Sequence, residues 1–458
     1  MKNITSKSNT PIYSQYFNLV STKGTPEYKN APLALFGDKA ICGSGDNVLV
    51  LGHAGSMKTH SIIINSILAS KNAEECMVIA DPGGHLHRET AHILEKSGYD
   101  VKRIEISKNG FSDNWNPLTD TIFWADCEVA AAAERFAHRF MTHFKAHDPS
   151  IDDIEFALEK ALLQLAILHC HRDRGISTLP RVMIFLSKSF KDMKKEIDNV
   201  LQQSVPALLR KLKPEDMLDS LLSKAGSGAD DTRKSLLKKL SFCTIPYTIE
   251  LLSKYDKDRS VELDLLSGMK LVSRPEEDNG TNGLIPPSGH EPHNCAYFIT
   301  CPFDDSPESV MGTMFLQMAI DSVVRLDEWG EERNGRKVHF ILDEFPQYCS
   351  CLSDFTQNVH KANGVARFTV AIQSIEQMPA SEQDARWYNA FQTFVFMGRY
   401  DNITDSFIMK IADTDAAVLF DELRSDNNKA LVCARGICAI IGDKAFSPKY
   451  FPELLQRR

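Results

Sequence analysis

Short runs of consecutive apolar residues recur along the chain, a pattern typical of strands that are buried on both faces of a parallel sheet. Many of these runs lead into a Gly, Pro or Asp turn or into a stretch with apolar residues at helical spacing. The alternation predicts an α/β fold. The predicted strands are 48–51, 76–80, 98–106, 295–301, 338–342, 367–374, 392–398 and 429–434.

Residues 126–271 have a different pattern, with Ala, Leu, Lys and Glu at helical spacing. We expect an all-α insert here, within an α/β domain formed by residues 31–125 and 272–458. Residues 1–30 are rich in Ser, Thr, Asn and Lys and predict an N-terminal arm. The helices expected in the insert are 127–144, 154–169, 179–187, 193–203, 206–222 and 232–242.

Length and charge limit the classes of protein that fit. With 458 residues, the chain is long enough for two domains. A formal net charge of −9 argues against a protein that coats DNA through its overall charge, so a DNA contact must use a local basic surface. Surface charges at helical spacing are more typical of a solvated face. The candidate clusters are Arg210–Lys211 with Lys213, Arg233–Lys234 with Lys238–Lys239, and His360–Lys361. No apolar run is long enough for a membrane span, which predicts a cytoplasmic protein.

The eleven cysteines include no C-x-x-C pair, which favours reduced cytosolic thiols over a disulfide framework. Cys349-x-Cys351 and His169–Cys170–His171 raise the alternative of a zinc site. Each group lacks a second pair of ligands at zinc-site spacing, so the sequence favours ordinary thiols.

The segment after the first predicted strand carries candidate phosphate chemistry. It reads Gly52-His53-Ala54-Gly55-Ser56-Met57-Lys58-Thr59 and leads into a predicted helix. In such a loop, backbone N–H groups bind an anion, the Lys ammonium reaches the outer phosphates and the Thr hydroxyl ligates Mg²⁺. Met57 departs from the usual pattern, which has Gly before the Lys. A plain turn between strand and helix is the alternative. The candidate nucleotide-binding residues are Gly52, Ala54, Gly55, Ser56, Met57, Lys58 and Thr59.

Two further strand ends carry polar side chains. The run from Val338 ends in Asp343 and Glu344, and the run from Arg367 ends in Gln373. Because doubly wound sheets bind ligands at the carboxyl ends of their strands, these residues predict a nucleotide site together with Lys58 and Thr59. Asp343 is expected to hold Mg²⁺, Glu344 to polarise the attacking water and Gln373 to orient water or sense the γ-phosphate. An acid at a helix N-cap is the alternative for the Asp–Glu pair.

The order of motifs from about residue 32 to 435 resembles the coupling ATPases of type IV secretion and conjugation, the TraG/TraD type. Gram-positive relatives, which also have Met before the loop Lys, are the most similar branch. The motifs that carry the resemblance are residues 52–59, Asp81–Pro82, Gly98–Tyr99, Asn116–Pro117, Glu159–Leu163, Leu179–Pro180, Leu342–Phe345 and Ile372–Gln377.

This resemblance implies a RecA-like P-loop ATPase that works as a homo-hexamer, with ATP and Mg²⁺ as cofactors. Such a motor receives a relaxase-bound single DNA strand, or protein cargo, and passes it to type IV secretion channel subunits. By the same resemblance, Lys58 and Thr59 bind the phosphates and Mg²⁺, and Asp343 holds Mg²⁺ through water. Glu344 is then the catalytic base and Gln373 the coupling residue.

Three departures from the family pattern keep other functions open. The family's N-terminal transmembrane helices are not present in the sequence, which suggests a soluble relative, a truncated form or a separate membrane anchor subunit. Gly83 and His85 replace a Lys and a Glu, and no arginine finger stands where the family has one; Lys361 and Arg367 lie nearest. A nucleotide-binding scaffold that hydrolyses weakly or not at all is therefore an alternative. A translocase on duplex DNA is a third.

Overall fold

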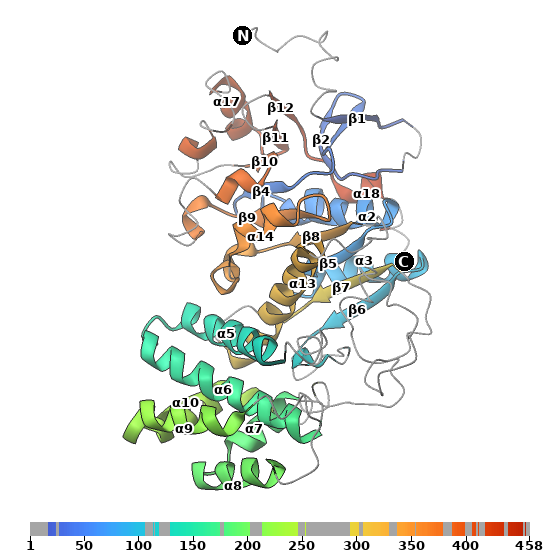
Figure 1. Ribbon diagram of the computed structural model, residues 1–458. Coiled ribbons are helices and arrows are strands. Elements are labelled where there is room, and N and C mark those ends of the chain that lie inside the picture. Colours follow the sequence, from blue (N-terminus) through green and yellow to red (C-terminus); the bar gives the residue numbers. More distant parts are fainter. Residues whose placement is uncertain are drawn as a thin grey trace.

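The computed structural model places a twelve-stranded sheet at the centre of the described part of the chain (Figure 1). The strand order is β1-β3-β2-β12-β11-β10-β4-β9-β8-β5-β7-β6. The residues described are 17–23, 27–105, 113, 115–118, 129–174, 178–201, 213–245, 252, 294–301, 306–328, 337–352, 354–378, 387–398, 405–408, 411, 417–434, 438–451 and 454.

Neighbouring strands from β10 to β6 run parallel, as the apolar runs predict. Every residue of β4, β5, β7, β8, β9 and β10 is buried, which explains why their sequences are mostly apolar. Polar exceptions such as His339 and Arg367 are hydrogen-bonded. The mixed α/β fold class is confirmed. The strands are β4 (Val48–Gly52), β5 (Cys76–Ala80), β6 (Asp100–Ile104), β7 (Cys295–Ile299), β8 (Val338–Leu342), β9 (Ala366–Ile372) and β10 (Thr393–Met397).

Beyond β10 the sheet continues in antiparallel pairings. Of these strands the sequence predicts β11 (Lys429–Ala434) but not β12 (Cys438–Asp443), β1 (Asn18–Ser21), β2 (Pro32–Phe36) or β3 (Lys39–Cys42). The expectation of a separate arm at residues 1–30 is wrong for the part that is described. There β1 pairs with β3, and Phe17 and Tyr28 are buried. Apolar burial therefore joins this segment to the sheet.

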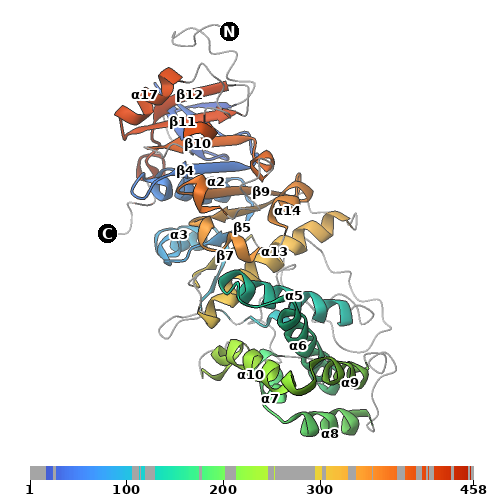
Figure 2. The same cartoon turned by 90° about the vertical axis from the view of Figure 1, so that its left-hand side faces the viewer.

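The two faces of the parallel strands support two separate hydrophobic clusters, because successive side chains point to opposite faces. Helices α2 (Ile64–Asn72) and α3 (His85–Lys96) pack in one cluster. Helices α13 (Val310–Glu328) and α14 (Phe355–Lys361) pack in the other. Figure 2 shows α3 and α13 on opposite sides of the sheet.

The predicted insert contains a group of helices that lies beyond the β6 edge of the sheet in both views (Figures 1 and 2). Its first helix, α5, contacts α13 and forms an Arg139–Asp321 ion pair with it. The helices are α5 (Val129–His147), α6 (Asp153–Arg174), α7 (Leu179–Leu186), α8 (Phe190–Leu201), α9 (Pro214–Ala225) and α10 (Ala229–Lys239).

Two short helices follow β10 and β12 along the chain. They are α17 (Ala417–Ser425) and α18 (Ser447–Tyr450), and α18 packs against the start of α2's helical segment. None of the helices in the described residues is long and apolar enough to span a membrane.

Candidate functional site

The sheet brings the three predicted strand ends to one place. Strand β4 lies between β10 and β9, and β8 lies beside β9, all parallel. The carboxyl ends of β4, β9 and β8 are therefore neighbours at one edge of the sheet. The loop after Gly52, the side chain of Gln373 and the pair Asp343–Glu344 all leave the sheet at this edge.

The loop after β4 needs unusual backbone conformations. Gly55 has φ +77° and Met57 has φ +69°, both in the left-handed region that favours glycine. Gly52 is packed so closely that an added Cβ would lie 2.8 Å from the carbonyl oxygen of Met397, as well as against Ser56. After Lys58 the chain forms a π-helical turn, Thr59–Ile63, that continues into α2. Met57 thus occupies a position for which Gly is the better residue.

Lys58 is turned into this loop. Its Nζ donates to the carbonyl oxygens of Gly52 and, at 3.2 Å, His53, and the residue is buried. Burial lowers the pKa of Lys58, while the nearby Asp343 and Glu344 carboxylates raise it. The ammonium therefore bonds the loop carbonyls close to two acids, and its role in phosphate binding stays a prediction.

Thr59 meets Asp343 directly. The Thr59 Oγ1 donates to Asp343 Oδ2 at 3.1 Å, although 284 residues separate the two. A hydroxyl and a carboxylate oxygen form the hard donor set that Mg²⁺ prefers. These two residues therefore fit the cation that the sequence predicts.

Glu344 and Gln373 form the second contact between strand ends. Gln373 Nε2 donates to Glu344 Oε2 at 3.1 Å. Glu344 itself has φ +51°, a left-handed conformation that non-glycine residues rarely adopt, and rarely adopted conformations cluster at functional sites. All five residues proposed for phosphate, metal and catalytic roles are thus brought together.

The electrostatics of Asp343 differ from those of an ordinary acid. Its pKa is raised to about 6, first by burial and then by the charge of Glu344, while the hydrogen bond from Thr59 lowers it. A buried carboxylate beside a second acid is stabilised by a cation, so binding of a divalent ion would restore its ionised form.

Two supporting residues have roles that the sequence does not reveal. Tyr348 is fully buried and its hydroxyl donates to the main-chain oxygen of Asp343 at 2.8 Å, which holds the turn that carries the acids. Asp81, in the family-like turn, is also buried and accepts a hydrogen bond from the His87 N–H at 2.8 Å. Asp81 therefore stabilises the start of α3.

The two nearest candidates for an arginine finger lie in different surroundings. Arg367 is buried at the amino end of β9, where its guanidinium donates to Glu75 Oε2 at 2.6 Å and to Ser70 Oγ at 3.2 Å. This pairing gives Arg367 a structural role. Lys361 instead borders an open groove of about 640 Å³ together with Thr356, Gln357, His360 and Asn389. No predicted phosphate or metal ligand lines that groove.

The basic clusters considered for DNA contain several charges that are already paired. Arg233 pairs with Asp230 at 3.1 Å and donates to the carbonyl oxygen of Leu186, which fits the alternative of a solvated face. In the same helix Lys239 binds the buried Glu159 at 2.8 Å. Arg210–Lys211 lies outside the described residues.

Comparison with known proteins adds a family to this geometry. The family model for type IV secretory system conjugative DNA transfer proteins matches residues 12–256, which is more than half of the chain. No curated protein sequence matches the chain.

Solved structures of the plasmid coupling protein TrwB share the fold. The TrwB complex with the non-hydrolysable GTP analogue GDPNP is 14% identical, with 94% of each chain covered and a TM-score of 0.57. TrwB with ADP and Mg²⁺ is also 14% identical, with 94% of each chain covered and a TM-score of 0.55. The conjugative coupling protein TrwBdeltaN70 with sulphate is 13% identical, with 94% of each chain covered and a TM-score of 0.56. At these identities the likeness establishes the fold alone.

Proposed function

Because the chain belongs to the type IV secretory system conjugative DNA transfer family, we propose that it is an ATP-driven coupling protein. It recruits a relaxase-bound single DNA strand, or protein cargo, and delivers it to the subunits of a type IV secretion channel. It works at the cytoplasmic face of the membrane, through its partners. The TrwB structures with ADP and Mg²⁺ and with a nucleotide analogue support nucleotide binding by this fold.

The arrangement of side chains supports one role for each site residue. The loop N–H groups and the Lys58 ammonium bind phosphate oxygens, with Lys58 exchanging its loop carbonyl partners for them. Thr59 and Asp343 hold Mg²⁺, the latter through water. When bound, Mg²⁺ neutralises charge on the phosphates.

Glu344 is the general base and accepts the proton of the attacking water, which must lie within hydrogen-bond reach of its carboxylate. Gln373, bonded to Glu344, links the occupancy of the site to strand β9. The direct contacts of Thr59 with Asp343 and of Gln373 with Glu344 are the observation that carries this proposal.

We also propose the domain division and the assembly that the family resemblance implies. Residues 31–125 and 272–458 form the nucleotide-binding domain, and residues 126–271 form the helical domain that meets cargo. Six copies form a ring in which each nucleotide lies between neighbours, so a neighbouring copy can supply the transition-state cation. Loss of such a cation costs about 10³-fold or more in rate.

The test is steady-state ATP hydrolysis with Mg²⁺, without DNA, with single-stranded DNA and with duplex DNA. The proposal expects single-stranded DNA to stimulate turnover, and Glu344→Gln to abolish it. Glu376→Gln, an exposed acid close in sequence to Gln373, removes the same charge and should retain full turnover. Stimulation by duplex DNA alone would instead support a duplex translocase.

A second candidate is a nucleotide-binding scaffold without useful turnover. The positive φ of Met57 favours it, because a side chain at this position strains the loop that must close around the phosphates. Nucleotide binding with no hydrolysis, even with DNA and at concentrations where rings form, would support the scaffold.

A further inference from the structure

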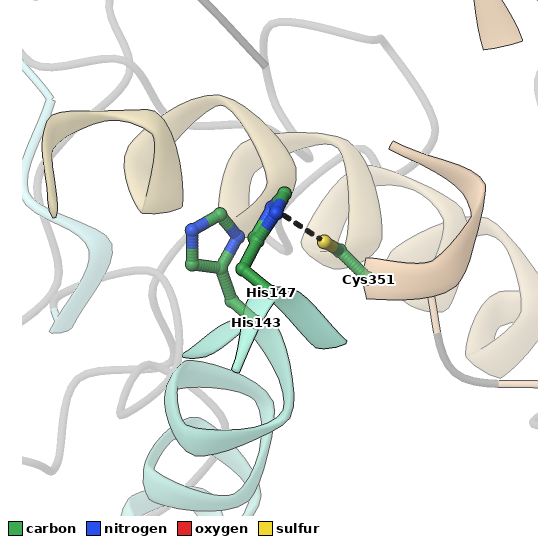
Figure 3. A group of neighbouring side chains, drawn as sticks. All are labelled: His143, His147 and Cys351. Atoms are coloured by element: carbon green, nitrogen blue, oxygen red, sulfur yellow. Dashed lines mark hydrogen bonds between the residues drawn. The ribbon is translucent and has the colours of Figure 1, made fainter. Parts of the chain in front are cut away.

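Three side chains outside the proposed nucleotide site meet where α5 touches the segment that follows Glu344. His143 and His147 lie one turn apart on α5, and Cys351 lies in the short helix Cys349–Cys351 (Figure 3). The nitrogen and sulfur atoms that they offer all lie within 4.8 Å of one another. From the sequence, Cys349-x-Cys351 lacks a second ligand pair for zinc, and the fold supplies one 204 residues away.

We propose that His143, His147 and Cys351 form a binding site for a zinc-class divalent transition metal that clamps α5 to the segment after Glu344. Two imidazoles and a thiolate are the donor set that selects such ions over Mg²⁺ or Ca²⁺. The proposal is independent of the proposed function, since none of the three residues takes part in nucleotide binding there.

The distances suit a tetrahedral ion. With metal bonds of about 2.0–2.3 Å, two ligand atoms of a tetrahedral zinc lie roughly 3.3–3.7 Å apart. Cys351 Sγ and His147 Nε2 are 3.4 Å apart, and the two imidazole centroids are 4.8 Å apart. The ligand atoms of all three residues lie within 4.8 Å of one another, so His143 must approach the other two by at most about 1 Å to complete a site with three protein ligands and one position for water.

The surroundings of His143 match the outer shell of a metal ligand. One ring nitrogen contacts Ser309 Oγ at 3.0 Å and the other contacts Thr313 Oγ1 at 2.9 Å. Both hydroxyls also donate to main-chain carbonyls. To bind a metal ion, one ring nitrogen must exchange its hydroxyl contact for the ion, and the released hydroxyl keeps its main-chain carbonyl as a partner. The N–H that remains bonded to a hydroxyl fixes the tautomer, as in most metal-bound histidines.

Two of the three ligands are buried, which limits the access of solvent to the ion. His143 is 1% exposed and Cys351 is 5% exposed, so an ion here would be largely shielded from water. The site lies seven residues after Glu344, and Tyr348 between them is bonded to the turn that carries Asp343. Metal binding would therefore fix the position of α5 relative to that turn.

The experiment uses the full-length protein, freed of metal by a chelator and then titrated with Co²⁺ without nucleotide. We expect one Co²⁺ per chain and the thiolate-to-metal charge-transfer absorption, which the oxygen ligands of Thr59 and Asp343 cannot give. Zn²⁺ should displace Co²⁺ and raise the melting temperature by at least about 2 °C at 100-fold excess over its dissociation constant.

Variants identify the ligands. Cys351→Ser and His147→Gln should each lose the absorption and the shift. Cys349→Ser in the same short helix and His138→Gln on α5 should retain the absorption and the shift in melting temperature. Because His147 is only partly buried, its variant remains informative even if Cys351→Ser misfolds. Absence of Co²⁺ binding, binding without the thiolate absorption, or the same absorption in His147→Gln would each overturn the proposal.

Discussion

Strands β8 and β9 carry a polar cluster at each end, and the two clusters differ in kind. At the amino end, Arg367 pairs with Glu75 at 2.6 Å, and His339 bonds Ser70 at 2.6 Å and Thr369 at 2.8 Å. The carboxyl-end cluster consists of Asp343, Glu344 and Gln373 with the adjoining loop residues Met57, Lys58 and Thr59. The amino-end cluster is a charge-paired network, whereas the carboxyl-end cluster places two acids side by side.

The difference shows in both backbone and charge. Arg367 and His339 lie on regular strands and Ser70 on α2, whereas Glu75 lies in the turn between α2 and β5. At the other end, Met57 and Glu344 themselves adopt positive φ. Burial and the adjacent Glu344 raise the pKa of Asp343 to about 6. Uncompensated charge and strain persist where a structure serves binding or catalysis, and a paired network serves stability. Sequence position on the same two strands does not distinguish these roles.

Substitutions in the carboxyl-end cluster should have the largest effects, on nucleotide binding and on turnover. Lys58→Ala should abolish nucleotide binding, because the only side-chain cation proposed for the phosphates is lost. Glu344→Gln should leave binding intact but lower turnover by about 10²–10⁴-fold, the contribution typical of a general base. Titration with a fluorescent ATP analogue and steady-state hydrolysis separate the two. Equal ATP affinity in the wild type and in Lys58→Ala would refute the phosphate-loop assignment.

The amino-end cluster should affect stability instead. Arg367→Met leaves Glu75 buried and unpaired, which should lower the free energy of unfolding by about 3–5 kcal/mol. Adding Glu75→Gln should recover much of this loss, because the unpaired charge is removed. Lys23→Met breaks a pair whose Lys side chain is 80% exposed and should cost less than about 1 kcal/mol.

Urea unfolding measures these differences, and hydrolysis per folded molecule serves as the second readout. If Arg367→Met lowered turnover in fully folded protein while leaving the unfolding midpoint unchanged, Arg367 would be a catalytic cation and the contrast between the clusters would be wrong.

Substitution of Asp343 should raise the free energy of unfolding, whereas substitution of Arg367 lowers it. Its folded pKa of about 6 lies above the ordinary 3.8, so ionisation opposes folding. Below about pH 3.8 the acid is neutral in both states. Between pH 3.8 and 6 the wild type loses stability progressively, and above pH 6 the loss is complete. Asp343→Asn should therefore stabilise the nucleotide-free protein at pH 8 by up to about 3 kcal/mol.

Melting curves from pH 4 to pH 8 test this expectation, with the exposed Asp354→Asn as the control. The difference from the wild type should grow up to pH 6 and then stay constant. The same variant should lose the stabilisation by Mg²⁺ and ATP. A difference that does not depend on pH would show that Asp343 is ionised in the folded protein throughout this range.

Sequence reasoning succeeds where burial is complete and fails where it is partial. Strand β4 is buried on both faces, so its sequence is continuously apolar up to Gly52, and β8 is apolar apart from His339. These runs locate the loop residues that follow the strands. Strand β1 has two exposed and two partly buried residues, Asn18–Ser21, and its sequence does not resemble a core strand. Antiparallel strands at the edge of a sheet often have this mixed pattern.

Sequence reasoning has a similar limit at the candidate sites. Local motifs identify Lys58, Thr59, Asp343, Glu344 and Gln373, but the contact between Thr59 and Asp343 depends on strand order. Likewise, only the packing of α5 on the segment after Glu344 brings His147 to Cys351. Side-chain chemistry can be predicted locally, whereas its partners depend on long-range packing.

The smallest effect concerns Met57, the residue that departs from the phosphate-loop pattern. Its left-handed conformation, φ +69°, costs about 1–2 kcal/mol for a residue with a Cβ, and its side chain is 40% exposed, so little packing opposes its removal. Met57→Gly should therefore raise the free energy of unfolding by about 1 kcal/mol, after the extra flexibility of Gly in the unfolded chain is deducted. Met57→Ala is the matched control, because it shortens the side chain but keeps the Cβ.

Urea unfolding of the two variants separates backbone strain from side-chain effects. If strain is the cause, only Met57→Gly gains stability, and it should also bind ATP more tightly, by less than about tenfold, because the loop no longer resists closing around the phosphates. Equal stability in Met57→Gly and Met57→Ala would mean that the loop is unstrained. The carboxyl-end cluster would then differ from the amino-end cluster in charge alone.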